Sequence, residues 1–172
     1  REEALLDTAS LRLKGKHNLQ NVMACAAVAA QLRVPKNKFQ TSIDRVEPLD
    51  HRIEPLGEVG GIIFVNDSKS TTVESTRAAI LAMGRPVILV AGGRDKGLPF
   101  TEIEPVLREH VKAAVLYGEA RDRIAACWQA FGPGKKEADF DAAVHTAFRE
   151  ASPGDCILLS PMCTSFDQFS SY

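Results

Sequence analysis

The segment Val87-Ile88-Leu89-Val90-Ala91-Gly92-Gly93-Arg94-Asp95-Lys96-Gly97 joins a run of apolar residues directly to a charged, glycine-rich loop. A short apolar run of this kind is typical of a strand that is buried on both faces of a parallel sheet. Two further segments follow the same plan, because residues 62–65 lead into the polar stretch 66–71 and residues 156–159 lead into 160–165. The sequence therefore predicts three buried strands that each end in a polar loop.

Helical patterns alternate with these strands. We predict helices at 72–83, 100–110, 119–131 and 139–150, a further strand at 113–117, and a strand at 53–56 joined to 62–65 by a hairpin through Gly60-Gly61. This alternation indicates an α/β fold, a Rossmann-like and mostly parallel sheet with helices on both faces. Two more helices, at about 18–32 and from Pro35 to about 46, precede a polar linker at 47–51, which is the predicted domain boundary.

Composition and charge exclude several classes of protein. The net charge is -1, with 45% hydrophobic and 25% charged residues, so no broad basic field indicates a nucleic-acid or membrane partner. The chain has no run of about 18 apolar residues and no signal-peptide plan at its first residues. The four cysteines lack metal-site spacing, which favours free thiols in a reducing compartment. We therefore expect a cytoplasmic protein.

The three polar loops are predicted to form one ligand site, since ligands bind beyond the carboxyl ends of the strands in open α/β sheets. Asp67-Ser68-Lys69 precedes a predicted helix N-terminus, which suits a phosphate or a carboxylate. The alternative is simple helix capping by residues 70–72, with Lys69 in solvent. The glycines at 92–97 allow close approach to a ligand, or they merely make the turn.

Aromatic and charged residues near these loops have structural alternatives. For Phe169 we favour a place in the core, Asp167 taken alone is a solvated charge or a cap, and Trp128 is expected to be half-buried on a helix. Gly15-Lys16-His17-Asn18 is not a Walker A sequence, and we find none elsewhere in the chain. An ATP-dependent enzyme would therefore keep its phosphate cradle outside these residues.

Five motifs follow one another in a recognisable order: Gly15-Lys16-His17-Asn18-Leu19-Gln20-Asn21, His51-Arg52-Ile53-Glu54, Asn66-Asp67-Ser68-Lys69-Ser70-Thr71, Gly92-Gly93-Arg94-Asp95-Lys96, and Leu159-Ser160-Pro161-Met162-Cys163-Thr164-Ser165-Phe166-Asp167-Gln168-Phe169. Together they resemble the Mur ligase family, and most closely its D-glutamate-adding branch. The first two motifs are shared with folylpolyglutamate synthases, whereas the third and fifth are more specific to that branch.

The resemblance implies a three-domain enzyme of which this chain is the C-terminal part. Residues 1–48 would be the tail of the central ATP-binding domain, and residues 49–172 the C-terminal amino-acid-binding domain. The UDP-binding domain, the P-loop, the magnesium ligands and a carbamylated lysine would lie upstream, so the fragment alone would be inactive. The implied cofactors are ATP and Mg²⁺, the implied substrates are UDP-N-acetylmuramoyl-L-alanine and D-glutamate, and the enzyme would be a monomer with no nucleic-acid or membrane partner.

The resemblance also implies roles for single residues, none of them catalytic. Residues that match nucleotide contacts are Asn21, Arg52 and Asp67. Residues that match positions around D-glutamate are Lys69, Thr71, Lys96, Ser165 and Tyr172. The chain departs mildly from the family at Ser70, Thr72 and Tyr172, where Ala, Asn and Phe are common.

The resemblance implies that ATP phosphorylates the terminal carboxylate of UDP-N-acetylmuramoyl-L-alanine, after which the D-glutamate amine attacks the acyl phosphate, phosphate leaves and an amide remains. Two alternatives remain open. One is another Mur or folylpolyglutamate-type ligase, and the other is a non-catalytic Rossmann-like binding module.

Overall fold

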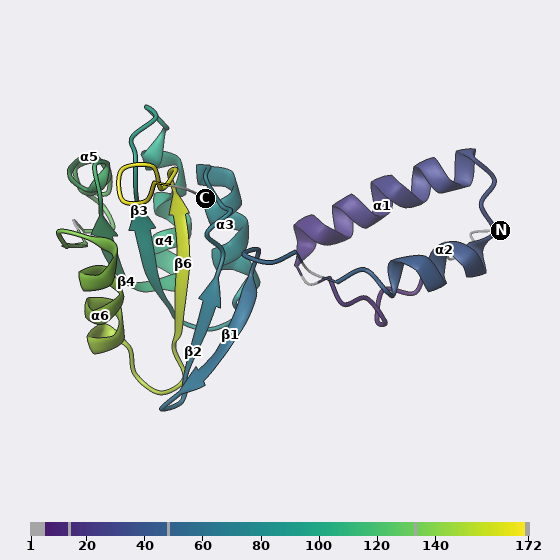
Figure 1. Ribbon diagram of the computed structural model, residues 1–172, viewed down its shortest axis with the longest axis horizontal. Coiled ribbons are helices and arrows are strands. Elements are labelled where there is room, and N and C mark those ends of the chain that lie inside the picture. Colours follow the sequence, from purple (N-terminus) through teal and green to yellow (C-terminus); the bar gives the residue numbers. More distant parts are fainter. Residues whose placement is uncertain (1–5, 14, 48, 133, 171–172) are drawn as a thin grey trace. The chain divides into compact units, whose positions relative to one another are not determined.

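The centre of the protein is β3 (Val87–Gly92), a strand in which every residue is buried. The computed structural model describes residues 6–13, 15–47, 49–132 and 134–170 (Figure 1). The chain divides into two compact units, Arg1–Leu49 and Asp50–Tyr172. Unit 1 contains the helices α1 (Lys16–Gln31) and α2 (Lys36–Ile43), and unit 2 contains the sheet.

The sheet of unit 2 is mostly parallel. Besides β3 it contains β1 (Glu54–Val59), β2 (Ile62–Asn66), β4 (Val111–Tyr117), β5 (Lys135–Lys136) and β6 (Cys156–Met162). Within the described residues the order is β1-β2-β6-β3-β4-β5, and only β1 is antiparallel to its neighbour. The hairpin from β1 to β2 turns at Gly60 and Gly61, with φ of 60° and 79°. Two positive φ values are what the favoured two-residue hairpin turn requires.

Helices cover both faces of this sheet, because successive residues of a strand point to opposite sides. Leu89 packs with the face that carries α3 (Val73–Ala82), the short 3₁₀ helix η1 (Phe100–Ile103), α4 (Glu104–His110) and α5 (Arg121–Cys127). Val90 packs on the other face, where Ala143 and Ala147 of α6 (Phe140–Glu150) complete a second cluster (Figure 1). The predicted α/β fold with helices on both faces is confirmed.

Two side-chain caps fix where the helices begin near the predicted site. The Thr72 hydroxyl accepts a hydrogen bond from the amide of Ser75 (3.2 Å), and the Ser75 hydroxyl in turn accepts one from the amide of Thr72, so α3 begins directly after the loop 66–71. The Asp139 carboxylate accepts from the amide of Ala142 (2.8 Å) and begins α6. Both caps satisfy N–H groups that a helix leaves unpaired at its first turn.

Three expectations about local structure were wrong, and one strand was not predicted. The helix predicted at 119–131 ends at Cys127. Trp128, expected to be half-buried, is fully buried, and its ring N–H is satisfied by the Phe100 carbonyl (2.8 Å). The last strand continues to Met162 and so includes residues that were expected in a loop. The pairing of β5 with β4 was not predicted, since two lysines carry no strand signal.

Asp155 supports the turn before β6. We predict that replacing it changes how the free energy of unfolding depends on pH. The side chain is buried, which by itself raises the pKa of Asp155, but the Lys112 ammonium (2.7 Å) and the Ser152 amide (2.8 Å) outweigh burial and hold that pKa below its usual value. A lowered pKa stabilises the fold above the unfolded-state value of about 4 and loses that effect as pH falls.

Asp155→Asn should therefore lower the free energy of unfolding by roughly 1–2 kcal/mol at pH 7, since half of the Lys112 side chain is exposed and screened. Urea denaturation at pH 7 and pH 3 tests this, with the difference from wild type expected to shrink at pH 3. A difference of equal size at both pH values would contradict the assignment.

Candidate functional site

Three polar loops meet at the carboxyl edge of the sheet, and backbone hydrogen bonds tie them together. The amide of Arg94, after β3, donates to the Thr164 carbonyl after β6 (2.7 Å). The amide of Met162 donates to the Ser70 carbonyl after β2 (2.9 Å), and the amide of Gly93 donates to Tyr117 at the end of β4 (3.2 Å). The loops are therefore connected to one another and form a single surface at the edge where α/β sheets bind ligands.

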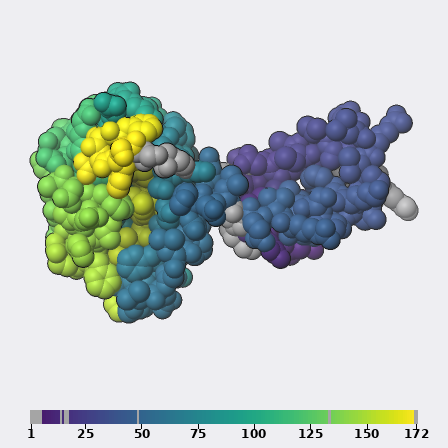
Figure 2. Space-filling model, viewed as in Figure 1, coloured from purple at the N-terminus to yellow at the C-terminus, as the bar shows by residue number. Residues whose placement is uncertain are grey.

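A cavity of about 290 Å³ opens at this edge, within unit 2. One part of its wall is polar and the other is aromatic or apolar, a combination typical of small-molecule sites. The polar lining residues are His51, Ser68, Thr71, Thr164 and Ser165, and the apolar ones are Tyr117, Phe140, Leu159, Pro161, Phe166 and Phe169. Figure 2 shows the segment after β6, in yellow, on the surface of unit 2.

Two of the residues predicted around an amino acid, Thr71 and Ser165, line this cavity together. Lys69 lies in the adjoining loop, where its amide donates to the His51 carbonyl (3.2 Å). Lys96 is exposed on the glycine-rich loop, which is shaped by the Asp95 carboxylate, since that group accepts from the Gly97 amide (2.8 Å). Tyr172 lies outside the described residues.

The residues predicted to contact a nucleotide are divided between the units. Asn21 is exposed on α1 of unit 1, whereas Arg52 is exposed at the start of unit 2. Asp67 is only 2% exposed, and its carboxylate accepts from the Ile53 amide (3.2 Å) and the Ser160 hydroxyl (2.8 Å). Burial raises the pKa of Asp67, which three internal hydrogen bonds and the charge of Arg52 partly oppose.

Two further titratable groups near the cavity are held in their neutral forms. Burial, followed by the charge of Asp167, raises the pKa of Tyr117, so its hydroxyl keeps its proton for hydrogen bonding. Burial, followed by the charge of Asp95, raises the pKa of Cys163 to about 12, although Lys96 acts in the opposite direction. Because the reactive form of cysteine is the thiolate, Cys163 is not placed as a nucleophile.

The aromatic wall of the cavity was not anticipated in full. Phe169 was expected in the core, but it is 46% exposed and meets Phe140 edge to face, with ring centroids 5.8 Å apart. Asp167 was interpreted as a solvated charge or a cap. One of its carboxylate oxygens accepts from the Glu119 amide (2.9 Å), and the other is buried without a partner among the described residues, so the side chain is not simply solvated. The apolar-to-polar change at the end of β4 was the only signal for Tyr117.

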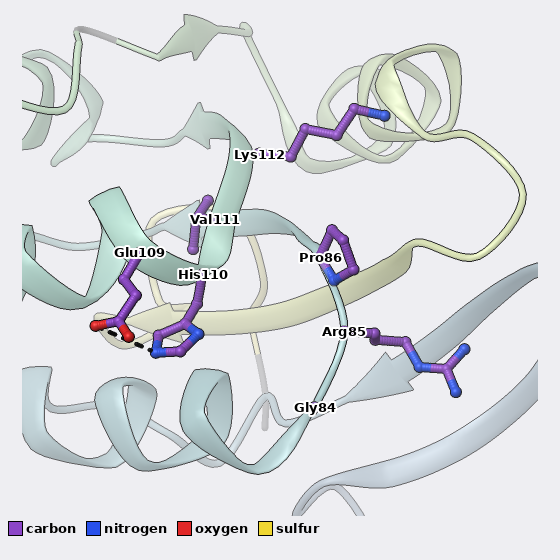
Figure 3. Close-up of a pocket in the computed structure, with 7 residues that line it drawn as sticks. All are labelled: Gly84, Arg85, Pro86, Glu109, His110, Val111 and Lys112. Carbon is purple, nitrogen blue, oxygen red and sulfur yellow. Dashed lines mark ion pairs between the residues drawn. The ribbon is translucent and has the colours of Figure 1, made fainter.

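A second hollow, of about 430 Å³, lies at the opposite edge of the sheet, between residues 84–86 and 109–112. Figure 3 shows that Glu109 and His110 face each other, whereas Arg85 and Lys112 point away from them, so the side chains do not share a common centre. Three of these side chains also have protein partners, because His110 lies 3.7 Å from Glu109 and Lys112 binds Asp155. This hollow therefore offers no convergent set of ligand-binding groups.

The described residues offer neither a metal site nor a membrane-spanning helix. No group of three or more His, Cys, Asp and Glu side chains in that part of the chain is placed to hold a metal ion. None of its helices is both long enough and apolar enough to cross a membrane. The expectation that magnesium ligands lie upstream stays a prediction.

Residues 51–163 match the family model of the Mur ligase, glutamate ligase domain. Curated relatives share substantial identity along the chain. UDP-N-acetylmuramoylalanine--D-glutamate ligase of Salinibacter ruber is 36% identical over 172 residues, which cover 99% of this chain. The protein of the same name from Chlamydia caviae is 42% identical over 157 residues, which cover 91% of this chain. The chain spans only 37% and 38% of the length of these two relatives.

Solved structures show the same fold at lower identity. MurF from Acinetobacter baumannii superposes with a TM-score of 0.68 at 18% identity, covering 87% of this chain and 35% of that one. Folylpolyglutamate synthase from Mycobacterium tuberculosis, solved with ADP and AMPPCP, also gives a TM-score of 0.68, at 17% identity, covering 90% of this chain and 39% of that one. These likenesses concern the fold alone.

Proposed function

The chain belongs to the Mur ligase family, and on that premise we propose that it is the C-terminal part of a cytoplasmic ligase that joins D-glutamate to UDP-N-acetylmuramoyl-L-alanine in peptidoglycan synthesis. One observation carries the proposal. Relatives that are 36–42% identical over 91–100% of this chain share the name UDP-N-acetylmuramoylalanine--D-glutamate ligase. In this proposal residues 1–48 complete the central ATP-binding domain, and residues 49–172 bind the incoming amino acid.

The geometry of the cavity supports a site for an amino acid with two carboxylates, each of which needs hydrogen-bond donors or a positive charge. Thr71 and Ser165 line it and offer hydroxyl donors. Lys69 lies in the chain between the lining residues Ser68 and Thr71, and Lys96 is exposed on the loop after β3. A carboxylate accepts hydrogen bonds from hydroxyls and is neutralised by an ammonium group. The aromatic wall formed by Phe140, Phe166 and Phe169 would cover the carbon chain and exclude water.

Exclusion of water suits the proposed chemistry. ATP would supply the phosphoryl group that activates the carboxylate of UDP-N-acetylmuramoyl-L-alanine, with Mg²⁺ held by the upstream part of the enzyme. The residues of this chain would hold the D-glutamate amine in position to attack the activated carboxyl, before water hydrolyses it. Arg52 fits a role beside the nucleotide, because an exposed guanidinium binds phosphate through two hydrogen bonds.

A ligase with another acceptor is the second candidate. MurF and folylpolyglutamate synthase share the fold, but at 18% and 17% identity their likeness carries no assignment of substrate. The polar segment 160–165 and the aromatic residues that follow it favour the D-glutamate-adding branch on the resemblance of their motif.

The proposed function predicts phosphate release by the full-length enzyme that depends on D-glutamate. With ATP, Mg²⁺ and UDP-N-acetylmuramoyl-L-alanine present, D-glutamate should support turnover, whereas L-glutamate and a diamino acid should not. Phosphate release with one of the other amino acids, and not with D-glutamate, would refute the proposed acceptor.

The 172-residue chain provides the matched control for that experiment. It contains no Walker A sequence, so it should release no phosphate from ATP under the same conditions. Amino-acid-dependent release by this chain alone would show that the division of labour between the two parts is wrong.

A further inference from the structure

The residues 51–53, which carry Arg52 at the start of unit 2, form a turn with an unfavourable backbone conformation. His51 and Ile53 have φ of 64° and 47°, in the left-handed region. This region is costly for a β-branched residue such as Ile53 and persists only where the surroundings hold it. The turn therefore needs anchoring contacts, and these fix the backbone from which the exposed Arg52 side chain extends.

Two hydrogen bonds to the loop after β2 anchor the turn. The Ile53 amide donates to the Asp67 carboxylate (3.2 Å), and the His51 carbonyl accepts from the Lys69 amide (3.2 Å). The His51 ring nitrogen Nδ1 also lies 2.7 Å from the Asn66 side-chain amide. Of these groups, the Asp67 carboxylate is the one that binds the backbone of Ile53 itself.

Asp67 accepts a hydrogen bond from the buried Ser160 hydroxyl, which in turn contacts the buried Thr76 hydroxyl, and the Ser70 hydroxyl also bonds to Asp67. The Ser160 hydroxyl of β6 lies 2.8 Å from the second Asp67 oxygen and 2.9 Å from the Thr76 hydroxyl of α3. A carboxylate only accepts, so the single Ser160 proton points to Asp67. The Thr76 hydroxyl therefore donates towards Ser160, where both the hydroxyl (2.9 Å) and the backbone carbonyl (3.3 Å) lie within reach. Both Ser160 and Thr76 are 0% exposed, so neither can touch a ligand at the surface.

We propose that Ser160 and Thr76 are positioning residues for the nucleotide, which act through Asp67 to hold the turn that carries Arg52. The chain of contacts runs from Thr76 to Ser160, to Asp67, to the Ile53 amide and so to Arg52. The inference rests on the proposed function only in assigning Arg52 to ATP. It also accounts for the burial of the Asp67 carboxylate, which a direct contact with a ligand would not require.

Substitution of Asp67 would not test this, because an effect could come from a lost ligand contact as easily as from a relaxed turn. The buried hydroxyls separate the two explanations. Thr76→Val removes the hydroxyl and keeps the shape, whereas Thr76→Ser keeps the hydroxyl and loses only a methyl group. Ser160→Ala breaks the same chain of contacts from β6, and Thr146→Val removes a buried hydroxyl from α6 as a control away from the turn.

The first measurement is hydrogen exchange of the Ile53 amide in the 172-residue chain, which needs no activity. Exchange should be about tenfold faster in Ser160→Ala and Thr76→Val, the loss expected when one hydrogen bond of an anchoring chain is removed. Thr76→Ser and Thr146→Val should exchange like wild type at this amide. Unchanged exchange at Ile53 in both Ser160→Ala and Thr76→Val would overturn the proposal.

The second measurement is the pair of KM values of the full-length enzyme. Ser160→Ala and Thr76→Val should raise the KM for ATP about tenfold and change the KM for the amino acid less than about twofold. Equal rises in both KM values, or faster exchange at Ile53 with an unchanged KM for ATP, would refute the positioning role. If the enzyme uses a different amino acid, D-glutamate is refuted as the substrate, but this test still holds because it measures the KM for ATP.

Discussion

Gly92→Ala is expected to destabilise the protein by roughly 3–5 kcal/mol, a large part of the stability of an ordinary domain. Gly92 ends β3 with φ of 143°, and a Cβ atom added there would lie 2.0 Å from the Tyr117 carbonyl oxygen and 2.8 Å from its carbon. These are backbone atoms of the neighbouring strand, so they cannot rotate away as a side chain does. Either the pairing of β3 with β4 opens or the loop after β3 is displaced.

Gly97→Ala is the matched control for this prediction. Gly97 lies in the same loop with φ of 73°, but a Cβ atom there would meet nothing within 4 Å. It should therefore cost only the backbone strain of a left-handed alanine, about 1–2 kcal/mol. Urea denaturation of the 172-residue chain compares the two variants, and equal losses of stability would show that the close approach of β3 and β4 does not require glycine.

The parts of the site that were predictable from the sequence lie at the ends of the strands. The strand ends at 66–71, 92–97 and 160–165 stood out because apolar runs change there to small polar and charged residues. In a parallel sheet such ends meet at one edge, and the structure brings Thr71 and Ser165 to one cavity. Local sequence was sufficient for this because strand burial and loop chemistry are both visible within about ten residues.

Contacts between distant segments were not predictable in the same way. Asp67 has the sequence context of a ligand-binding carboxylate, but the hydroxyl that occupies it comes from Ser160, which is 93 residues away. The apolar pattern favoured a helix through Trp128, yet its ring N–H binds the Phe100 carbonyl where α5 has already ended. In both cases a buried polar group selects its partner through the tertiary structure, and one sequence contains no record of that pairing.

Lys96→Ala should raise the KM of the full-length enzyme for D-glutamate by about tenfold to over a hundredfold, which corresponds to roughly 1.5–3 kcal/mol for a lost charge-assisted hydrogen bond. Lys96 is exposed on a loop that is held in place, because the Asp95 carboxylate binds the Gly97 amide (2.8 Å) and the Arg123 guanidinium (2.7 Å). Burial raises the pKa of Cys163, and the Lys96 ammonium charge partly opposes that shift.

The control for Lys96 is its neighbour Arg94, an equally charged residue of the same loop. The Arg94 side chain is 59% exposed and lies 3.9 Å from the Glu119 carboxylate, so it already has an anionic partner. Arg94→Ala should change the KM for D-glutamate by less than about twofold, as expected for an exposed ion pair. Steady-state kinetics with ATP and D-glutamate varied in turn would separate the two residues. If Lys96→Ala raised both KM values equally, the ammonium would be contributing to the general field of the site and not to a D-glutamate carboxylate, because a direct contact acts on one ligand only.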